Sequence, residues 1–219
     1  MKKYMQVYGE TVFDLGYLLF MWTAARTLYL NFTGAEQLLF TAAALALAIG
    51  DSAHLLPRIY ALHTRGLAYY RRMLGWGKLI TSLTMTLFYV LLWQIYLLKF
   101  GGSIWPGLNT AVVVLALLRV LLCLLPQNRF FQAATSNHWS IIRNIPLFLL
   151  GLIVGISFGF AQPVAQANFT QMGPAIAVSF VCYIPVVIRA HRYPKLGMLM
   201  LPKTCAYIWM IVILLRSGS

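Results

Sequence analysis

The most regular feature of the chain is a series of long apolar stretches joined by short polar links. A hydrocarbon core about 30 Å thick needs roughly 20 mostly apolar residues per helix. Stretches close to this length cover residues 11–31, 36–57, 75–98, 107–126, 140–161, 173–190 and 197–216. Glycine and proline mark many of their ends, including Pro57 after the second stretch and Pro126 after the fourth. The pattern predicts an all-α protein whose seven transmembrane helices form one bundle and one domain, residues 1–219.

Composition points to lipid as the solvent. Of the 219 residues, 61% are hydrophobic and 10% are charged, whereas about a quarter of a soluble domain is charged. So few polar residues cannot cover a surface in water. We therefore expect an integral protein of a bacterial cytoplasmic (inner) membrane. The three cysteines lie in apolar stretches without metal-binding spacing, and we expect neither a metal nor a cofactor.

Basic residues gather in alternate links and give the expected orientation. On the side of Lys2 and Lys3 the links carry Arg58, Arg65, Arg71, Arg72, Lys78, Arg129, Arg143, Arg189, Arg192 and Lys195. The other side has Lys99 and Arg216. The positive-inside rule then places the N-terminus in the cytoplasm and the C-terminus outside. It also explains the net charge of +13 without nucleic acid as a partner.

Ionisable residues inside the apolar stretches are costly in a membrane and usually face a bundle interior or a water-filled cavity. Asp51, His54 and Arg58 are spaced i, i+3 and i+7, so they share one helical face. The remaining candidates on the same side of the membrane are Asp14, Lys78, Thr81, Arg119, Arg143, Asn144 and Lys203. These positions predict a polar cavity that opens toward the cytoplasm.

The predicted cavity is cationic, because bases outnumber the candidate carboxylates Asp14 and Asp51. A phosphate or carboxylate group on a ligand would neutralise the excess. The alternative is structural: residues near the interface, such as Arg58 and Lys78, only cap and anchor helices, and Arg119 and Lys203 only form ion pairs. Both interpretations are open at this point.

The stretch from Ala48 to Arg58, AIGDSAHLLPR, resembles the GD…LLP segment of the lysoplasmalogenase-like family of multi-span membrane hydrolases. The resemblance implies hydrolysis of the vinyl ether bond of lysoplasmalogens by intramembrane aspartates acting as acid and base, with Asp51 as one of them. The chain has Thr81 and Ser82 where the family has a histidine, and its sixth stretch has no acid. Asp14 is then the candidate for the second carboxylate.

Three classes of function follow from these observations. The first is an intramembrane hydrolase of a lysolipid or another anionic lipid-like substrate. In it Asp51, His54 and Asp14 would be catalytic, and Arg119 and Lys203 would bind the lipid phosphate. The second is a transporter or binding protein for a small anionic ligand, and the third is a non-enzymatic membrane subunit that locks its helices through buried polar groups. Membrane lipids are expected partners in each, whereas oligomeric state, substrate and enzymatic character are left open.

Overall fold

The computed structural model describes residues 2–31, 34–102, 105–132, 137–161, 167–189 and 192–218. Over these residues the chain forms seven α-helices. They are α1 Lys2–Leu30, α2 Ala35–His63, α3 Arg71–Phe100, α4 Leu108–Leu124, α5 Asn137–Phe160, α6 Met172–Arg189 and α7 Met200–Gly218. Short 3-10 helices lie at η1 Pro126–Asn128, η3 Ala167–Gln171 and η4 Pro194–Leu199. The predicted all-helical fold is confirmed, each apolar stretch giving one helix, although residue 190 of the sixth stretch lies outside the described residues.

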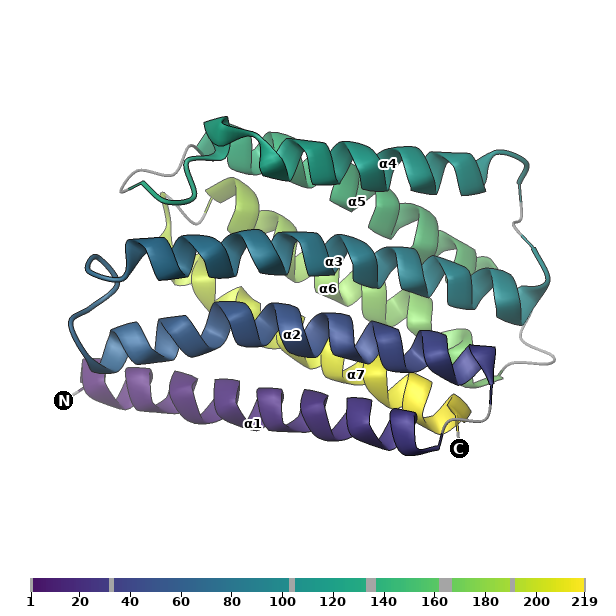
Figure 1. The fold of residues 1–219 in the computed structure, drawn as a ribbon, viewed down its shortest axis with the longest axis horizontal. Helices are drawn as coiled ribbons and strands as arrows, with labels where there is room; N and C mark the ends of the chain where they lie inside the picture. Colours follow the sequence, from purple (N-terminus) through teal and green to yellow (C-terminus); the bar gives the residue numbers. More distant parts are fainter. Residues whose placement is uncertain are drawn as a thin grey trace.

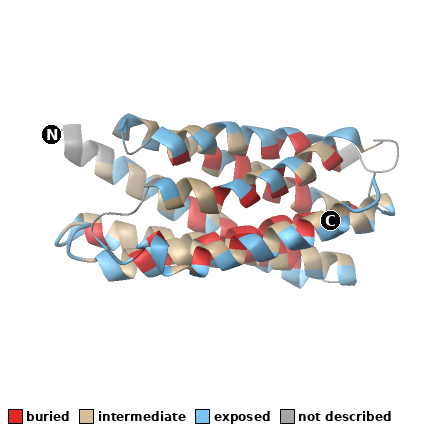
Figure 2. Ribbon diagram, turned by 90° about the horizontal axis from the view of Figure 1, so that it is seen from above, coloured by how far each residue is buried: buried red, intermediate tan, exposed pale blue. Residues whose placement is uncertain are grey.

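The helices run roughly along one direction and form two layers (Figure 1). The helices α1, α2, α3 and α4 lie side by side in chain order, and α5, α6 and α7 lie behind them. Contacts of α1 with α7, and of α3 and α4 with α5, join the layers. Buried residues lie on the faces that the layers turn toward each other (Figure 2). Polar side chains in the middle of the bundle are therefore enclosed by several helices.

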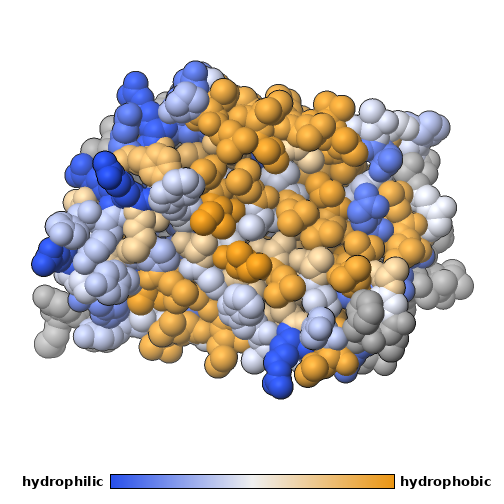
Figure 3. Space-filling model, viewed as in Figure 1, coloured by the Kyte–Doolittle hydropathy of each residue, from blue (hydrophilic) through white to orange (hydrophobic). Residues whose placement is uncertain are grey.

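Five segments are long and apolar enough to cross a bilayer: Ala35–His63, Arg71–Phe100, His138–Phe160, Phe169–Arg189 and Lys195–Ser217. The α4 helix is apolar but shorter, and α1 falls outside this group although it has 29 residues. Apolar side chains cover the middle of the visible face, and hydrophilic ones gather toward one end (Figure 3). The fold is consistent with a helical membrane protein.

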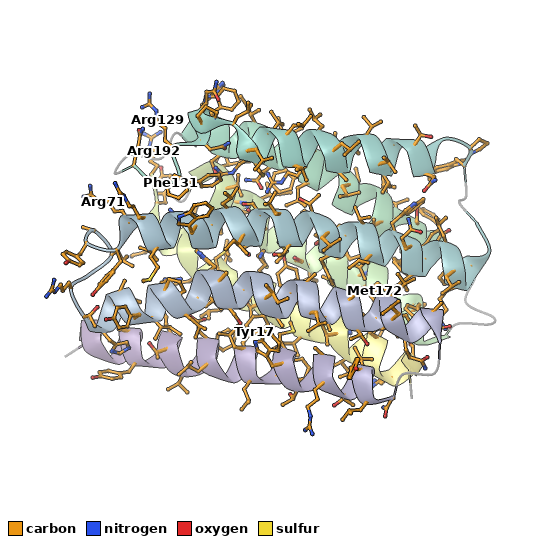
Figure 4. The ribbon with its side chains drawn as sticks, in the orientation of Figure 1. Tyr17, Arg71, Arg129, Phe131, Met172 and Arg192 are labelled. Atoms are coloured by element: carbon orange, nitrogen blue, oxygen red, sulfur yellow. The ribbon has the colours of Figure 1, made fainter. Side chains whose placement is uncertain are left out.

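The two ends of the bundle differ in charge. The N-terminus lies at the same end as the links α2–α3, α4–α5 and α6–α7, and the C-terminus lies at the other (Figure 1). Arg71, Arg129 and Arg192, one from each of these links or its border, lie together at the first end (Figure 4). We call this the basic end, and the opposite one the far end.

The prediction that the second helix ends at Pro57 is wrong, because α2 continues to His63. Proline has no N–H, so Pro57 leaves the carbonyl of Ala53, one turn earlier, without its helical partner. A Cβ at Gly77 of α3 would overlap that carbonyl oxygen. Gly77 thus lets α3 approach α2 closely at the point where the α2 backbone lacks an internal hydrogen bond. The α2 helix continues past Pro57.

Aromatic rings and one ion pair fill the far end between α2, α3, α5 and η3. Phe40, Tyr96, Phe100, Phe158 and Phe169 form edge-to-face, tilted and stacked pairs with centroids 5.1 to 6.5 Å apart. Lys99 pairs with Glu36, and its Nζ lies 5.7 Å from the ring centroids of Phe40 and Phe169. We call these five rings the far-end aromatic cluster.

Candidate functional site

A cavity of about 280 Å³ lies inside the bundle in the half nearer the basic end. Side chains of α2, α3, α4, α5, α6 and α7 line it, and we call it the inner cavity. Its charged side chains are Asp51, Lys78, Arg119, Arg143 and Lys203. His54 and Thr81 also line it, together with Ser140, Tyr183 and Tyr207. The structure thus brings Asp51, Arg119 and Lys203, predicted from three separate helices, to one cavity.

A second hollow of about 550 Å³ lies nearer the basic end, and we call it the vestibule. Arg58, Arg71 and Lys78 supply its cations, and Leu67, Leu74 and Phe130 its apolar walls. His54 and Lys78 line both hollows. The vestibule and the inner cavity therefore adjoin at these two side chains.

Hydroxyl groups from both neighbouring helices hold Asp51. Tyr17 of α1 donates a hydrogen bond to Oδ2, and Thr81 of α3 donates to Oδ1 at 3.4 Å. Tyr17 lies between α1 and α2 (Figure 4). Lys203 supplies the favourable charge interaction with this carboxylate. Asp51 is thus fixed in position by hydroxyls and faces a cation across the cavity.

Two tyrosines enclose the Lys203 ammonium group. Its Nζ lies 4.3 Å from the ring centroid of Tyr207 and 4.9 Å from that of Tyr183. Cation–π attraction of this kind is worth about 2 kcal/mol or more where the charge is removed from water, and Lys203 is only 7% exposed. The rings therefore stabilise a buried positive charge without neutralising it.

Two arginine side chains line the α4–α5 side of the cavity. Arg119, 2% exposed, donates to the backbone carbonyl of Arg143. Arg143 donates to Asn128 Oδ1 at 3.0 Å and to Ser140 Oγ at 3.4 Å. The buried Nε atoms of both arginines have no hydrogen-bond partner among the described residues. The two arginines therefore keep donor capacity that the protein does not use.

Among the described residues, no acidic side chain forms an ion pair with Arg119 or Arg143. The chain contains four acidic residues, and all lie in described segments. Glu10 pairs with Arg58 at 3.0 Å, and Glu36 pairs with Lys99 at the far end. Asp51 accepts from Tyr17 and Thr81, and Asp14 lies on α1, where it interacts electrostatically with Arg58. The inner cavity thus holds one carboxylate against four basic side chains.

Three predicted site residues lie outside the lining of the inner cavity. Asp14 lines neither hollow, and Arg58 lines only the vestibule. Asn144 is buried behind the lining, where it donates to the Ser140 carbonyl and accepts from the Tyr183 hydroxyl at 3.2 Å. Asn144 therefore orients the Tyr183 ring that contacts Lys203, and it does not itself line the cavity.

Sequence reasoning missed Tyr17, Tyr183, Tyr207 and Asn128. A tyrosine in an apolar stretch has the same pattern as a packing residue, so the three tyrosines gave no signal. Asn128 did give one, because it follows Pro126-Gln127 at the predicted end of the fourth apolar stretch. Its Nδ2 donates to the carbonyls of Leu122 and Leu125 at 2.6 and 2.9 Å, which closes the end of α4.

No family model matches the chain, and comparisons with curated proteins and with solved structures gave no match. The resemblance to lysoplasmalogenase-like hydrolases therefore stays a prediction. Among the described residues, no group of three or more His, Cys, Asp or Glu side chains is placed to hold a metal ion. The function must be inferred from the charges and contacts of the cavity.

Proposed function

We propose that this protein binds a phosphate- or carboxylate-bearing ligand in the inner cavity. The observation that carries the proposal is that Arg119 is buried, that the buried Nε atoms of Arg119 and Arg143 have no hydrogen-bond partner, and that neither arginine forms an ion pair among the described residues. Removing an ion from water costs several kcal/mol even after relaxation. An anionic ligand would offset that cost, since guanidinium groups bind the oxygens of phosphate and carboxylate in pairs.

The proposal includes a topology in which seven helices cross a bacterial cytoplasmic membrane, with the N-terminus inside and the C-terminus outside. The gathering of Arg71, Arg129 and Arg192 at the basic end supports this orientation (Figure 4). The vestibule would then open toward the cytoplasm, and the inner cavity would lie in the cytoplasmic half of the bilayer.

The size of the cavity limits the ligand. Cavities that enclose drug-sized molecules measure about 300–1,000 Å³, and the inner cavity has about 280 Å³. That volume suits a small anion or the headgroup of a lipid, but it cannot enclose a whole lysolipid. The shared chemistry is therefore a phosphate or carboxylate group, whether free or attached to a lipid.

Calorimetric titration of the purified protein in a neutral detergent tests the proposal. The probes are inorganic phosphate, glycerol 3-phosphate, and lysophosphatidate in mixed micelles, which separate a free anion from a lipid headgroup. We expect at least one to bind, and Arg119→Gln and Arg143→Gln each to weaken binding by about tenfold or more. Arg26→Gln is the matched control, because Arg26 is an exposed residue of α1 that lines neither hollow.

Two results would overturn the proposal. One is the absence of binding for all three probes. The other is binding that is as strong in Arg119→Gln and Arg143→Gln as in Arg26→Gln, because the attraction would then come from the overall positive charge of the chain.

A second candidate is hydrolysis of a lysolipid whose headgroup lies in the cavity. One observation favours it: Asp51 lines the same cavity as the arginines and is oriented by Tyr17 and Thr81. A fixed carboxylate can take a proton from an attacking water. Asp14 lines neither hollow, so His54 is the second proton-carrying group in this version.

Release of the aldehyde or fatty acid from lysoplasmalogen and lysophospholipid substrates tests this candidate. We expect Asp51→Asn to abolish turnover while phosphate binding persists. Turnover that survives Asp51→Asn, or a wild-type protein that binds these lipids without cleaving them, would reject hydrolysis and leave the binding function intact.

A further inference from the structure

We infer that the inner cavity and the vestibule form one bipartite site for a ligand with two anionic groups. The inference rests on the proposed function and narrows its ligand. One anionic group would contact Arg119, Arg143 and Lys203 in the inner cavity, and the other would lie in the vestibule. A bisphosphate or a phosphorylated carboxylic acid with a spacer has this chemistry.

The first step is that the two hollows adjoin. His54 and Lys78 line both of them. His54 Nδ1 is buried and has no hydrogen-bond partner among the described residues. A ligand that extends from one hollow into the other would pass between these two side chains, where Lys78 can contact either of its anionic groups.

The second step is the charge of the vestibule, which is also cationic. Arg58, Arg71 and Lys78 line it without a carboxylate in the lining. Glu10, which pairs with Arg58, offsets one of these charges. Arg71 and Leu74 belong to the first turn of α3, a helix of 30 residues. The positive end of its helix dipole therefore adds to the attraction for an anion.

The third step is the length of the site along α2 and α3, from Asp51 and Lys78 at the inner cavity to Arg58 and Arg71 in the vestibule. Arg71 precedes Lys78 by seven residues on α3, and Asp51 precedes Arg58 by seven on α2. At 1.5 Å per residue each interval is about 10 Å along the helix axis. Two phosphates joined directly, as in pyrophosphate, are too close to span this length. The spacer would instead run past Leu74 and Phe130, whose apolar side chains line the vestibule.

A series of alkane bisphosphonates of increasing chain length, from ethane to octane, tests the inference by calorimetric titration. Each is compared with the alkyl monophosphonate of the same chain length, which controls for apolar contact. We expect affinity to pass through a maximum at an intermediate length. At that length the bisphosphonate should bind at least about tenfold tighter than the monophosphonate, because the second contact is intramolecular.

Variants at adjacent arginines separate a second contact from a general charge effect. Arg71→Gln should remove the advantage of the bisphosphonate and leave the monophosphonate unaffected. Arg72→Gln removes the same charge from an exposed neighbour that does not line the vestibule, and it should preserve the advantage. Lys78→Gln should weaken both classes of ligand, since Lys78 lines both hollows.

The outcomes distinguish this inference from the proposed function. If monophosphonates bind and bisphosphonates bind no tighter, or if their advantage persists in Arg71→Gln, the bipartite site is wrong and the anion-binding cavity stands. If neither class of ligand binds, the inner cavity is not an anion site, and both proposals fall.

Discussion

Asp51 depends on Tyr17 for its position in the cavity. The Tyr17 hydroxyl bonds to one carboxylate oxygen, whereas the bond from Thr81 to the other is long at 3.4 Å. The two donors come from α1 and α3, so the carboxylate of α2 ties three helices together. Tyr17 is thus a positioning residue for the single carboxylate that lines the inner cavity.

Replacing Tyr17 with phenylalanine should lower the free energy of unfolding by about 1 kcal/mol. Hydrogen bonds between membrane helices average about 0.6 kcal/mol and reach about 1.7, and a carboxylate acceptor places this bond above the average. Equilibrium unfolding in mixed micelles measures the change. Tyr29→Phe is the control, because Tyr29 is an exposed tyrosine of the same helix. Equal losses in the two variants would show that the Tyr17 hydroxyl has no special role.

Several cavity residues could be predicted from the sequence, because a charge in an apolar stretch is costly wherever it lies. This rule found Asp51, Arg119 and Lys203 without knowledge of the fold. It could not find Tyr183 or Tyr207, whose role depends on the ammonium group placed between their rings. Nor could it show that Asp14 lies outside the cavity, since that depends on which face α1 turns toward α2.

At the scale of elements, the pairing of α2 with α3 positions most of the site. Asp51 and His54 lie on one helix, and Lys78 and Thr81 lie on the other. Gly77 lies against the Ala53 carbonyl that Pro57 leaves without a helical partner. A small residue at this contact therefore sets the distance between the two helices at the level of the cavity.

Gly77→Ala should destabilise the protein by about 1–3 kcal/mol, because the added methyl group must displace backbone atoms of α2. The same substitution should weaken phosphate binding, since it moves His54 and Lys78 apart. Thermal unfolding and calorimetric titration measure the two effects.

Gly16→Ala on α1 is the matched control for this change. A Cβ at Gly16 has no neighbour within 4 Å, so the variant should gain helix propensity of up to about 1 kcal/mol. Two variants of equal stability would contradict the close approach at Gly77.

The apolar pattern predicted most helix ends to within a few residues, and its failures have physical reasons. It began the first helix at residue 11, whereas α1 begins at Lys2, because the polar residues of its first turns look like a link. It ended the second helix at Pro57, because the sequence shows the lost hydrogen bond but not the glycine of another helix that accommodates it.

At the scale of the whole molecule, the chain carries 17 basic and four acidic residues. Arg71 at the start of α3, and Arg129 and Arg192 in two of the links, lie at the basic end (Figure 4). Pairing between acids and bases cannot balance this excess, so the charge must be balanced by lipids, solvent ions or ligand. The uneven distribution of the basic residues is the physical basis of the proposed orientation.

Reporter fusions test that orientation. Alkaline phosphatase fused to the C-terminus should be active, and green fluorescent protein at the same position should be dark, because the C-terminus is expected outside. Fusions in the α4–α5 link, at Gln132, should give the opposite pattern. Identical signals at the two positions would show that an even number of spans separates them, and the seven-span topology would be wrong.

The remaining classes of function differ in whether the far-end aromatic cluster has to open. A binding protein or a hydrolase can load and unload through the vestibule while Phe40, Phe158 and Phe169 stay in contact. A carrier must part these rings in every cycle and break the Glu36–Lys99 pair, at about 0.5–1.5 kcal/mol per ring pair beyond the loss of buried area. In a carrier the gate would thus lie at the opposite end from the charges that select the cargo.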